Sequence, residues 1–140
     1  MEKKNEAILE ISISNSDFLL LKYFLTSKFY YAVIIDDYPV EISNEELLFS
    51  AFDLQARLRC MISPNWNSFY EGLTQALYDD FANFKGICFL FKQGKKFKNN
   101  LPGAYKTLIE IIENESRDAR ELLEKYSWEK KNIIRLIINY

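Results

Sequence analysis

Carboxylates are the side chains of this sequence that could carry general acid–base chemistry, and they occur as two adjacent pairs, Asp36-Asp37 and Asp79-Asp80. A general acid and its base must converge on one substrate. Adjacent residues of a strand instead point to opposite faces, and aspartates at the ends of strands and helices are usual in solvated turns. We therefore interpret both pairs as turn residues, and the sequence predicts no catalytic residue.

Histidine is absent from the 140 residues of the chain. This absence excludes Ser-His-Asp and Cys-His nucleophiles and the zinc sites that use imidazole. The cysteines, Cys60 and Cys88, form no Cys-x-x-Cys pair and have apolar neighbours, so we expect buried free thiols. The segment from Gln93 to Lys96 lacks the serine or threonine of a phosphate-binding loop. We expect no cofactor, no metal and no enzymatic activity.

Lysines cluster between Lys92 and Lys98, with Phe97 among them. Such a segment can bind RNA by combining phosphate contacts with base stacking. The formal net charge of the chain is -2, however, so the molecule as a whole has no field that attracts polyanions. We expect a solvated basic loop, and RNA binding stays open as the less favoured alternative.

Hydrophobic periodicity predicts an α/β protein that forms a single domain over residues 1–140. Nearly continuous apolar runs predict strands at Phe29–Tyr38, Gly86–Phe91 and Ile133–Ile138. Amphipathic stretches between them predict about three packed helices, and right-handed crossovers make the three-stranded sheet mainly parallel. The residues predicted to cap or open the three helices are Ser43 with Glu46, Asn65, and Asn99 or Asn100 followed by Pro102.

Residues 1–28 fit this scheme least well. Leu9, Ile11 and Ile13 alternate with polar residues, which indicates an extra, half-exposed N-terminal strand. Asp17–Leu25 fits either a strand or a short helix, and the pattern leaves both alternatives open.

The apolar stretch Phe18–Ile35 contains Lys22 and Lys28, each of which makes insertion into a membrane costly. Carboxylates also interrupt the N-terminal apolar segment, where a signal peptide needs an unbroken core. We therefore expect a cytoplasmic protein without a membrane span.

The helix that follows Pro64 carries polar side chains on one face. Residues three and four apart stack along a helix, so Asn67, Glu71 and Thr74 share that face. We expect Trp66, Phe69 and Leu73, on the opposite side, to root the helix in the core. A rigid helix of this kind presents its polar groups with little conformational entropy left to lose on binding. An ordinary solvated face is the alternative, and the spacing alone does not exclude it.

The run Asn65-Trp66-Asn67-Ser68-Phe69-Tyr70-Glu71 resembles the central motif of the barstar-like family, which comprises intracellular inhibitors and immunity partners of bacterial ribonucleases. Members of that family carry, in order, an asparagine, a bulky apolar residue, an aspartate or asparagine, a small residue, a bulky residue, an aromatic residue and an acidic residue. From about Tyr31 to Tyr140 the order of predicted elements is also similar. The resemblance implies a barstar-like fold.

The resemblance also implies how such a chain works. The motif helix and the loop before it would fill the active site of a ribonuclease, where Glu71 would take the place of a substrate phosphate. Glu113, in the later long helix, matches a second acidic contact of the family. The implied partner-binding residues are Met61, Ile62, Ser63, Asn65, Trp66, Asn67, Tyr70, Glu71, Thr74 and Glu113.

Two departures from the family pattern concern the target. The segment Met61-Ile62-Ser63-Pro64 stands where the namesake has an aromatic pair followed by Gly-Glu, and Asn67 stands where it has an aspartate. A less acidic face implies a different or less basic nuclease, because complementary charge governs encounter rate and partner choice. We therefore expect a bacterial nuclease inhibitor that is monomeric when free and binds neither nucleic acid nor membranes. The alternative is an interaction or regulatory module of the same fold with a non-nuclease partner.

Overall fold

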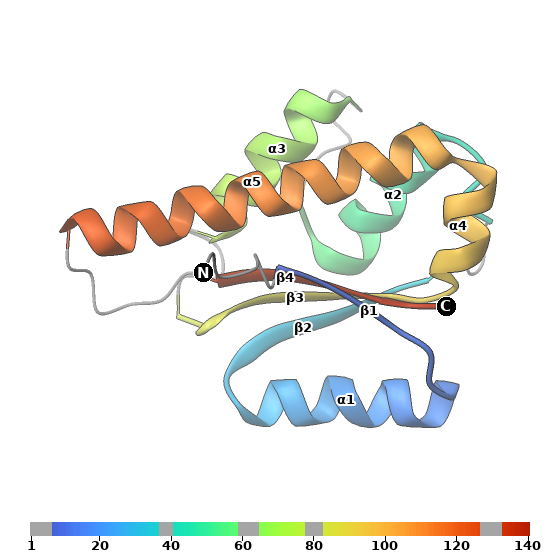
Figure 1. Cartoon of the computed structure of the whole chain (residues 1–140), viewed down its shortest axis with the longest axis horizontal. Coiled ribbons are helices and arrows are strands. Elements are labelled where there is room, and N and C mark those ends of the chain that lie inside the picture. Colours follow the sequence, from blue (N-terminus) through green and yellow to red (C-terminus); the bar gives the residue numbers. More distant parts are fainter. Residues whose placement is uncertain (1–6, 37–40, 59–64, 78–82, 127–132) are drawn as a thin grey trace, which may run out of the picture.

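The computed structural model describes residues 7–36, 41–58, 65–77, 83–126 and 133–140. Four strands form one sheet in the order β1-β4-β3-β2, and all neighbouring strands are parallel (Figure 1). The strands are β1 (Ile8–Ile11), β2 (Tyr30–Ile35), β3 (Gly86–Phe91) and β4 (Ile133–Asn139). The α/β class and the parallel sheet are confirmed. The extra N-terminal strand is present, so the sheet has four strands rather than three.

Helices cover both faces of the sheet. Helix α1 packs on one face, and α2, α3, α4 and α5 pack on the other (Figure 1). The helices are α1 (Asn15–Ser27), α2 (Glu45–Ala56), α3 (Trp66–Gln75), α4 (Gly94–Asn100) and α5 (Pro102–Tyr126). These are five helices within the described ranges, whereas the sequence led us to expect about three.

The position of α1 follows from the strand order. The chain steps from β2 to β3 and from β3 to β4 in one direction across the sheet, and from β1 to β2 in the opposite direction. Crossovers between parallel strands share one hand. A crossover that runs in the opposite direction must therefore use the opposite face, which places α1 away from the other helices.

Three local predictions were wrong, two of them about helix caps. The cap of α2 is Asn44, whose side chain accepts a hydrogen bond from the Leu47 backbone N–H at 2.8 Å, so Ser43 is not the cap. The basic segment after β3 is not a loop but helix α4. Asn99 and Asn100 belong to the end of α4 and do not cap α5, which begins at Pro102.

The larger core lies between the sheet and the helices α2, α3 and α5. Phe52 on α2 contacts Phe69 on α3 and Phe89 on β3, with ring centroids 5.0 and 5.2 Å apart. All three side chains are fully buried. Burying a ring of this size stabilises the fold by roughly 1.5–3 kcal/mol, and edge-to-face pairs add about 0.5–1.5 kcal/mol. These contacts fix α3 relative to the sheet.

A smaller core lies between the sheet and α1. Phe18 of α1 is 1% exposed and packs with Ala32, Cys88, Leu90 and Ile137 of the sheet. The Cys88 thiol is free and buried, as expected, and burial raises its pKa to about 11. Cys60 lies outside the described residues. None of the helices in the described ranges is long and apolar enough to cross a membrane.

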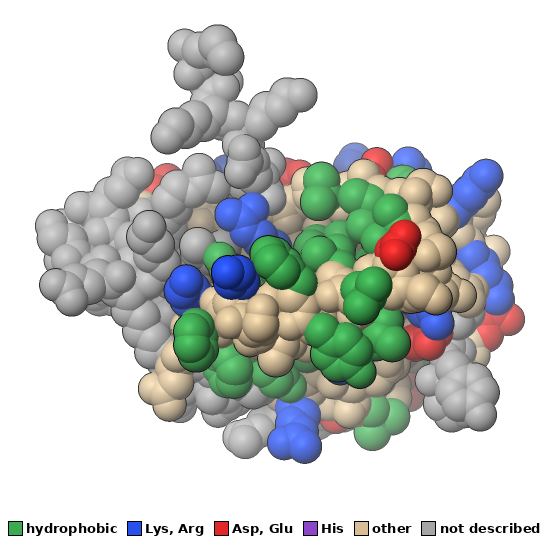
Figure 2. Space-filling model, turned by 90° about the horizontal axis from the view of Figure 1, so that it is seen from below, with side chains coloured by type: hydrophobic (Ala, Val, Ile, Leu, Met, Phe, Trp, Pro, Cys, Tyr) green, Lys and Arg blue, Asp and Glu red, His purple; other side chains and the backbone are tan. Residues whose placement is uncertain are grey.

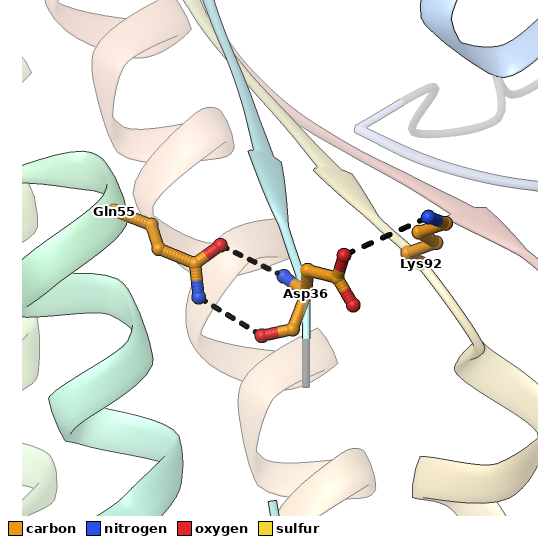
Figure 3. A network of polar contacts seen from close by, with 3 residues as sticks. All are labelled: Asp36, Gln55 and Lys92. Carbon is orange, nitrogen blue, oxygen red and sulfur yellow. Dashed lines mark hydrogen bonds and ion pairs between the residues drawn. The ribbon is translucent and has the colours of Figure 1, made fainter. Parts of the chain in front are cut away.

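Asp36, the residue after β2, takes part in a polar network (Figure 3). Its backbone N–H donates to Gln55 Oε1 at 3.0 Å, and Gln55 Nε2 donates to the Asp36 carbonyl at 2.9 Å. Lys92 Nζ lies 3.6 Å from Asp36 Oδ2. These contacts join β2, α2 and the end of β3, so Asp36 has a structural partner on each side. Asp37, Asp79 and Asp80 lie outside the described residues.

Candidate functional site

Helix α3 begins at a well-formed cap. The Asn65 side chain accepts a hydrogen bond from the Ser68 backbone N–H at 2.8 Å, and the Asn65 carbonyl accepts one from the Phe69 N–H at 3.0 Å. The backbone of Asn65 is extended, as an N-cap requires. Asn65 therefore fixes where the helix starts, which is the capping role that its sequence position predicts.

One side of α3 is fixed firmly to the rest of the molecule. Phe69 and Leu73 are completely buried, and the Trp66 ring meets Phe49 edge-on with centroids 4.9 Å apart. Gly72 packs against the chain at Leu58, where a Cβ on Gly72 would lie 2.3 Å from the Leu58 carbonyl oxygen. Only glycine allows this close approach, so α3 sits directly on the segment that follows α2.

The other side of α3 faces solvent. Asn67 and Glu71 are exposed, and Tyr70 is 41% exposed. These side chains lie within about 100° of arc around the helix, since successive residues are about 100° apart. The structure therefore brings together the exposed part of the predicted motif, and the Glu71 carboxylate points away from the core.

Thr74 lies on the same arc but turns toward α5. Its Oγ1 is 3.1 Å from the Tyr70 carbonyl oxygen and 3.1 Å from Glu115 Oε1. Glu115 is 2% exposed, and no donor within the described residues reaches its Oε2. Burial is the main cause that raises the pKa of Glu115, while hydrogen bonds from Thr74 and Tyr70 act in the opposite direction.

Negative charge gathers beside Tyr70. The charge of Glu115 is the largest cause that raises the pKa of Tyr70, and burial and the charge of Asp118 add to it. Asp118 is exposed on α5. We define the α3–α5 face as the surface formed by Asn67, Tyr70, Glu71, Thr74, Glu115 and Asp118. This face is acidic and suits a cationic partner.

The sequence analysis did not predict Glu115 or Asp118. The acidic residue that it predicted in this helix is Glu113. Glu113 is half-buried on α5 and lies about 200° around the helix from Glu115. Because Glu115 contacts α3, the side of α5 nearest the motif is that of Glu115. The signal was present: Glu115 occupies a position of the apolar stripe, three residues after Ile112, where a carboxylate is unusual.

Met61, Ile62 and Ser63, the predicted contacts in the segment before α3, lie outside the described residues. The described part of the N-terminal region does not cover the α3–α5 face. Helix α1 is on the opposite side of the sheet, and β1 lies at its edge beside β4 (Figure 1).

A second polar cluster joins α5 to the edge of the sheet. The Tyr105 hydroxyl donates to Glu10 Oε1 at 2.6 Å and lies 2.9 Å from the Tyr140 hydroxyl. Hydrogen bonds from Tyr105 and then Tyr140 lower the pKa of Glu10, and burial raises that of Tyr105. Lys98 Nζ lies 5.3 Å from the centre of the Tyr105 ring. Each of these groups already has a partner, so the cluster is best explained as a clamp between α5, β1 and β4.

The predicted basic loop is likewise engaged in contacts within the fold. Lys92 pairs with Asp36, and Lys96 Nζ lies 3.2 Å from Glu41 Oε1. Both lysines border a shallow hollow between the end of β3, helix α4 and the segment at Glu41 and Ile42. Among the described residues, no group of three or more histidine, cysteine, aspartate or glutamate side chains could hold a metal ion.

Comparison with known proteins adds no relative: no family model, no curated protein and no solved structure matches this chain.

Proposed function

We propose that this protein is a cytoplasmic inhibitor that binds the active site of a bacterial ribonuclease or toxin nuclease through the α3–α5 face. One observation carries the proposal. Glu71 and Asn67 are exposed on a helix that is capped by Asn65 and rooted in the core by Phe69 and Leu73. The family resemblance of the motif supplies the nature of the target.

The chemistry of the exposed groups suits such a target. A ribonuclease active site holds a phosphodiester with cationic and hydrogen-bonding groups, and a carboxylate can accept the same hydrogen bonds as a phosphate oxygen. Glu71 supplies that carboxylate, and Asn67 supplies a neutral amide beside it. The buried and exposed acids of α5, Glu115 and Asp118, extend the negative field toward the partner and favour rapid encounter.

The rigidity of α3 matters as much as its charge. The cap, the buried side chains and the close approach at Gly72 are in place before a partner arrives. Binding then costs little ordering of the inhibitor, so more of the contact energy appears as affinity. Tyr70, which is partly exposed, and Trp66 at the start of the helix supply apolar contact around the charged groups.

Capture of partners from the native host tests the proposal. The wild-type chain should retain a nuclease from a host lysate, and Glu71→Gln should lose it. Asp17→Asn, on the opposite side of the sheet, is the matched control and should retain it. Co-expression of the captured nuclease with the wild-type chain should then rescue host growth.

A different result would point elsewhere. Retention of the same proteins by wild type and Glu71→Gln would show that α3 is not the contact. Loss of a non-nuclease protein with Glu71→Gln would favour an interaction or regulatory module of the same fold.

A further inference from the structure

The outer face of α1 carries large exposed apolar side chains, and the ammonium groups of Lys22 and Lys28 lie 6.0 and 5.6 Å from the ring centres of Tyr23 and Phe24. Leu19, Leu20, Tyr23 and Phe24 are 42%, 62%, 59% and 56% exposed. We call these four side chains the α1 face. Figure 2 shows hydrophobic side chains gathered over α1 on this side of the molecule. A surface helix normally turns polar residues to solvent, whereas α1 carries large apolar side chains both toward the sheet, where Phe18 is buried, and toward solvent.

Phe29, which follows the C-cap of α1, is an aromatic residue with a strained backbone conformation. Its φ is 68°, and its N–H donates to the Thr26 carbonyl at 3.1 Å in the position that glycine usually occupies after a helix. A bulky residue with positive φ is an outlier. The ring is nevertheless 69% exposed, so burial of the ring within this chain does not explain the strain. The same turn leads the chain into β2, where the Phe29 carbonyl accepts a hydrogen bond from the Lys85 N–H at 2.8 Å.

Charges on α1 are arranged to match a second copy of the same helix. Asp17 lies in the first turn, and Lys28 caps the C-terminal end. Eleven residues separate them, which places both on nearly the same side of the helix, about 20° apart. In an antiparallel pair related by a twofold axis, each Asp17 would face Lys28 of the other copy. Both charges flank the α1 face along its Phe24 edge, and Lys28 Nζ lies 5.6 Å from the centre of the Phe24 ring.

We propose that two copies of this chain associate through antiparallel α1 helices, with the α1 faces in contact and Asp17 paired with Lys28 of the other copy. Such an interface is isologous and closes as a dimer. The sequence alone led us to expect a free monomer, but that expectation did not include an exposed apolar helix.

The size of the surface sets the expected strength. A fully covered aromatic side chain buries about 150–250 Å², so the two rings of the α1 face, each more than half exposed, offer on the order of 100 Å² each. With two leucines, the patch reaches several hundred Å², the size of the largest functional patches on monomers. A standard interface buries roughly 800 Å² per partner. The dimer should therefore be weak and depend on protein concentration.

The same features argue against a membrane as the occupant. Interfacial membrane helices combine an apolar face with a strongly charged polar face that stays in water. The face of α1 opposite the exposed patch is instead buried on the sheet through Phe18.

Charge reversal in the full-length chain tests the pairing. Sedimentation equilibrium should show a monomer–dimer equilibrium for the wild type. Asp17→Lys and Lys28→Asp should each weaken self-association roughly tenfold, because two symmetric pairs become repulsive. An equimolar mixture of the two variants, and the double variant with both changes, should recover wild-type association. Only a pairing of position 17 with position 28 predicts this recovery.

Replacement of exposed leucines by glutamate is the second part of the test. Leu20→Glu should abolish the dimer, whereas Leu54→Glu should not, since Leu54 is 78% exposed on α2 across the sheet. A wild type that stays monomeric at all concentrations, equal effects of the two leucine variants, or no recovery in the mixture would each overturn the proposal. Binding of a monomer to phosphatidylglycerol vesicles would overturn it as well. None of the α1 variants should change nuclease capture, so this test is separate from that of Glu71.

Discussion

Glu71 carries the most direct prediction at the scale of single residues. Glu71→Gln keeps the shape of the exposed side chain and removes its charge. Hydrogen bonds to charged groups contribute about 1.5–3 kcal/mol, so affinity for the nuclease should fall between about tenfold and a hundredfold. Titration calorimetry would measure this change. Urea unfolding should show stability within about 0.5 kcal/mol of wild type, since the side chain is exposed. A large loss of stability would instead assign Glu71 a structural role.

Glu115 makes the stability of the protein depend on pH. Burial raises its pKa above the ordinary 4.5, so the folded protein holds this proton more tightly than the unfolded chain. The stabilising contribution of the group is therefore complete below pH 4.5 and is lost as pH rises through the raised pKa. Glu115→Gln stays neutral and keeps an oxygen for Thr74. It should be more stable than wild type at neutral pH, and the difference should vanish in acid.

Urea unfolding at a series of pH values would measure that difference. Glu121→Gln is the control, because Glu121 is exposed further along α5. A difference between Glu115→Gln and wild type that does not vary with pH would show that the pKa of Glu115 is the same in the folded and unfolded states.

At the scale of elements, the contact between α3 and the segment after α2 depends on Gly72. A methyl group there would meet the Leu58 carbonyl oxygen at 2.3 Å, and backbone must move to admit it. We expect Gly72→Ala to destabilise the protein by about 1–3 kcal/mol and to weaken nuclease binding by displacing α3. Thermal unfolding and calorimetry would measure the two effects.

Gly103 is the matched control for that change. It lies in the first turn of α5, and a methyl group added there would meet nothing within 4 Å. Gly103→Ala should stabilise the protein by about 0.5–1 kcal/mol, because alanine favours a helix. Equal effects of the two substitutions would show that the steric conflict at Gly72 is relieved at no cost.

Substitution of Phe29, after the end of α1, should increase the stability of the fold and weaken self-association. Phe29→Gly relieves a left-handed conformation that costs roughly 1–2 kcal/mol but adds about 0.5–1 kcal/mol of glycine entropy. The net gain in stability should be about 0.5–1 kcal/mol, while loss of the ring should weaken self-association. Arg57→Gly is the control: Arg57 ends α2 with a φ of 57° on the other side of the sheet. It should gain stability without changing self-association in sedimentation experiments.

At the scale of the whole molecule, the sequence predicted best where burial leaves a simple pattern. The strand Gly86–Phe91 has the predicted bounds because both faces of this central strand are covered, which leaves an unbroken apolar run. Asn65 was likewise predicted as the cap of α3. Helix α4 was missed because only Gly94 and Phe97 are buried in its seven residues, too few to form a stripe. Asp17–Leu25 stayed ambiguous because a helix that carries large apolar side chains toward both the sheet and solvent has no clear period.

The site was less predictable than the fold for a related reason. Spacing predicted that Asn67 and Glu71 share an exposed face of one helix, and both are exposed on α3, since residues on one helix share a face whatever surrounds them. Glu115 contributes through contact between α3 and α5, two helices far apart in sequence. Such a contact depends on how the helices pack, which periodicity within one helix does not reveal.

The placement of α1 and α3 on opposite sides of the sheet fixes the stoichiometry of any larger assembly. Two chains joined at α1 would point their acidic surfaces outward at either end, so that each captures its own target without steric competition. The result would be a double-ended particle of two inhibitors and two enzymes. Diluting the inhibitor would then split this particle into halves that each remain fully inhibited.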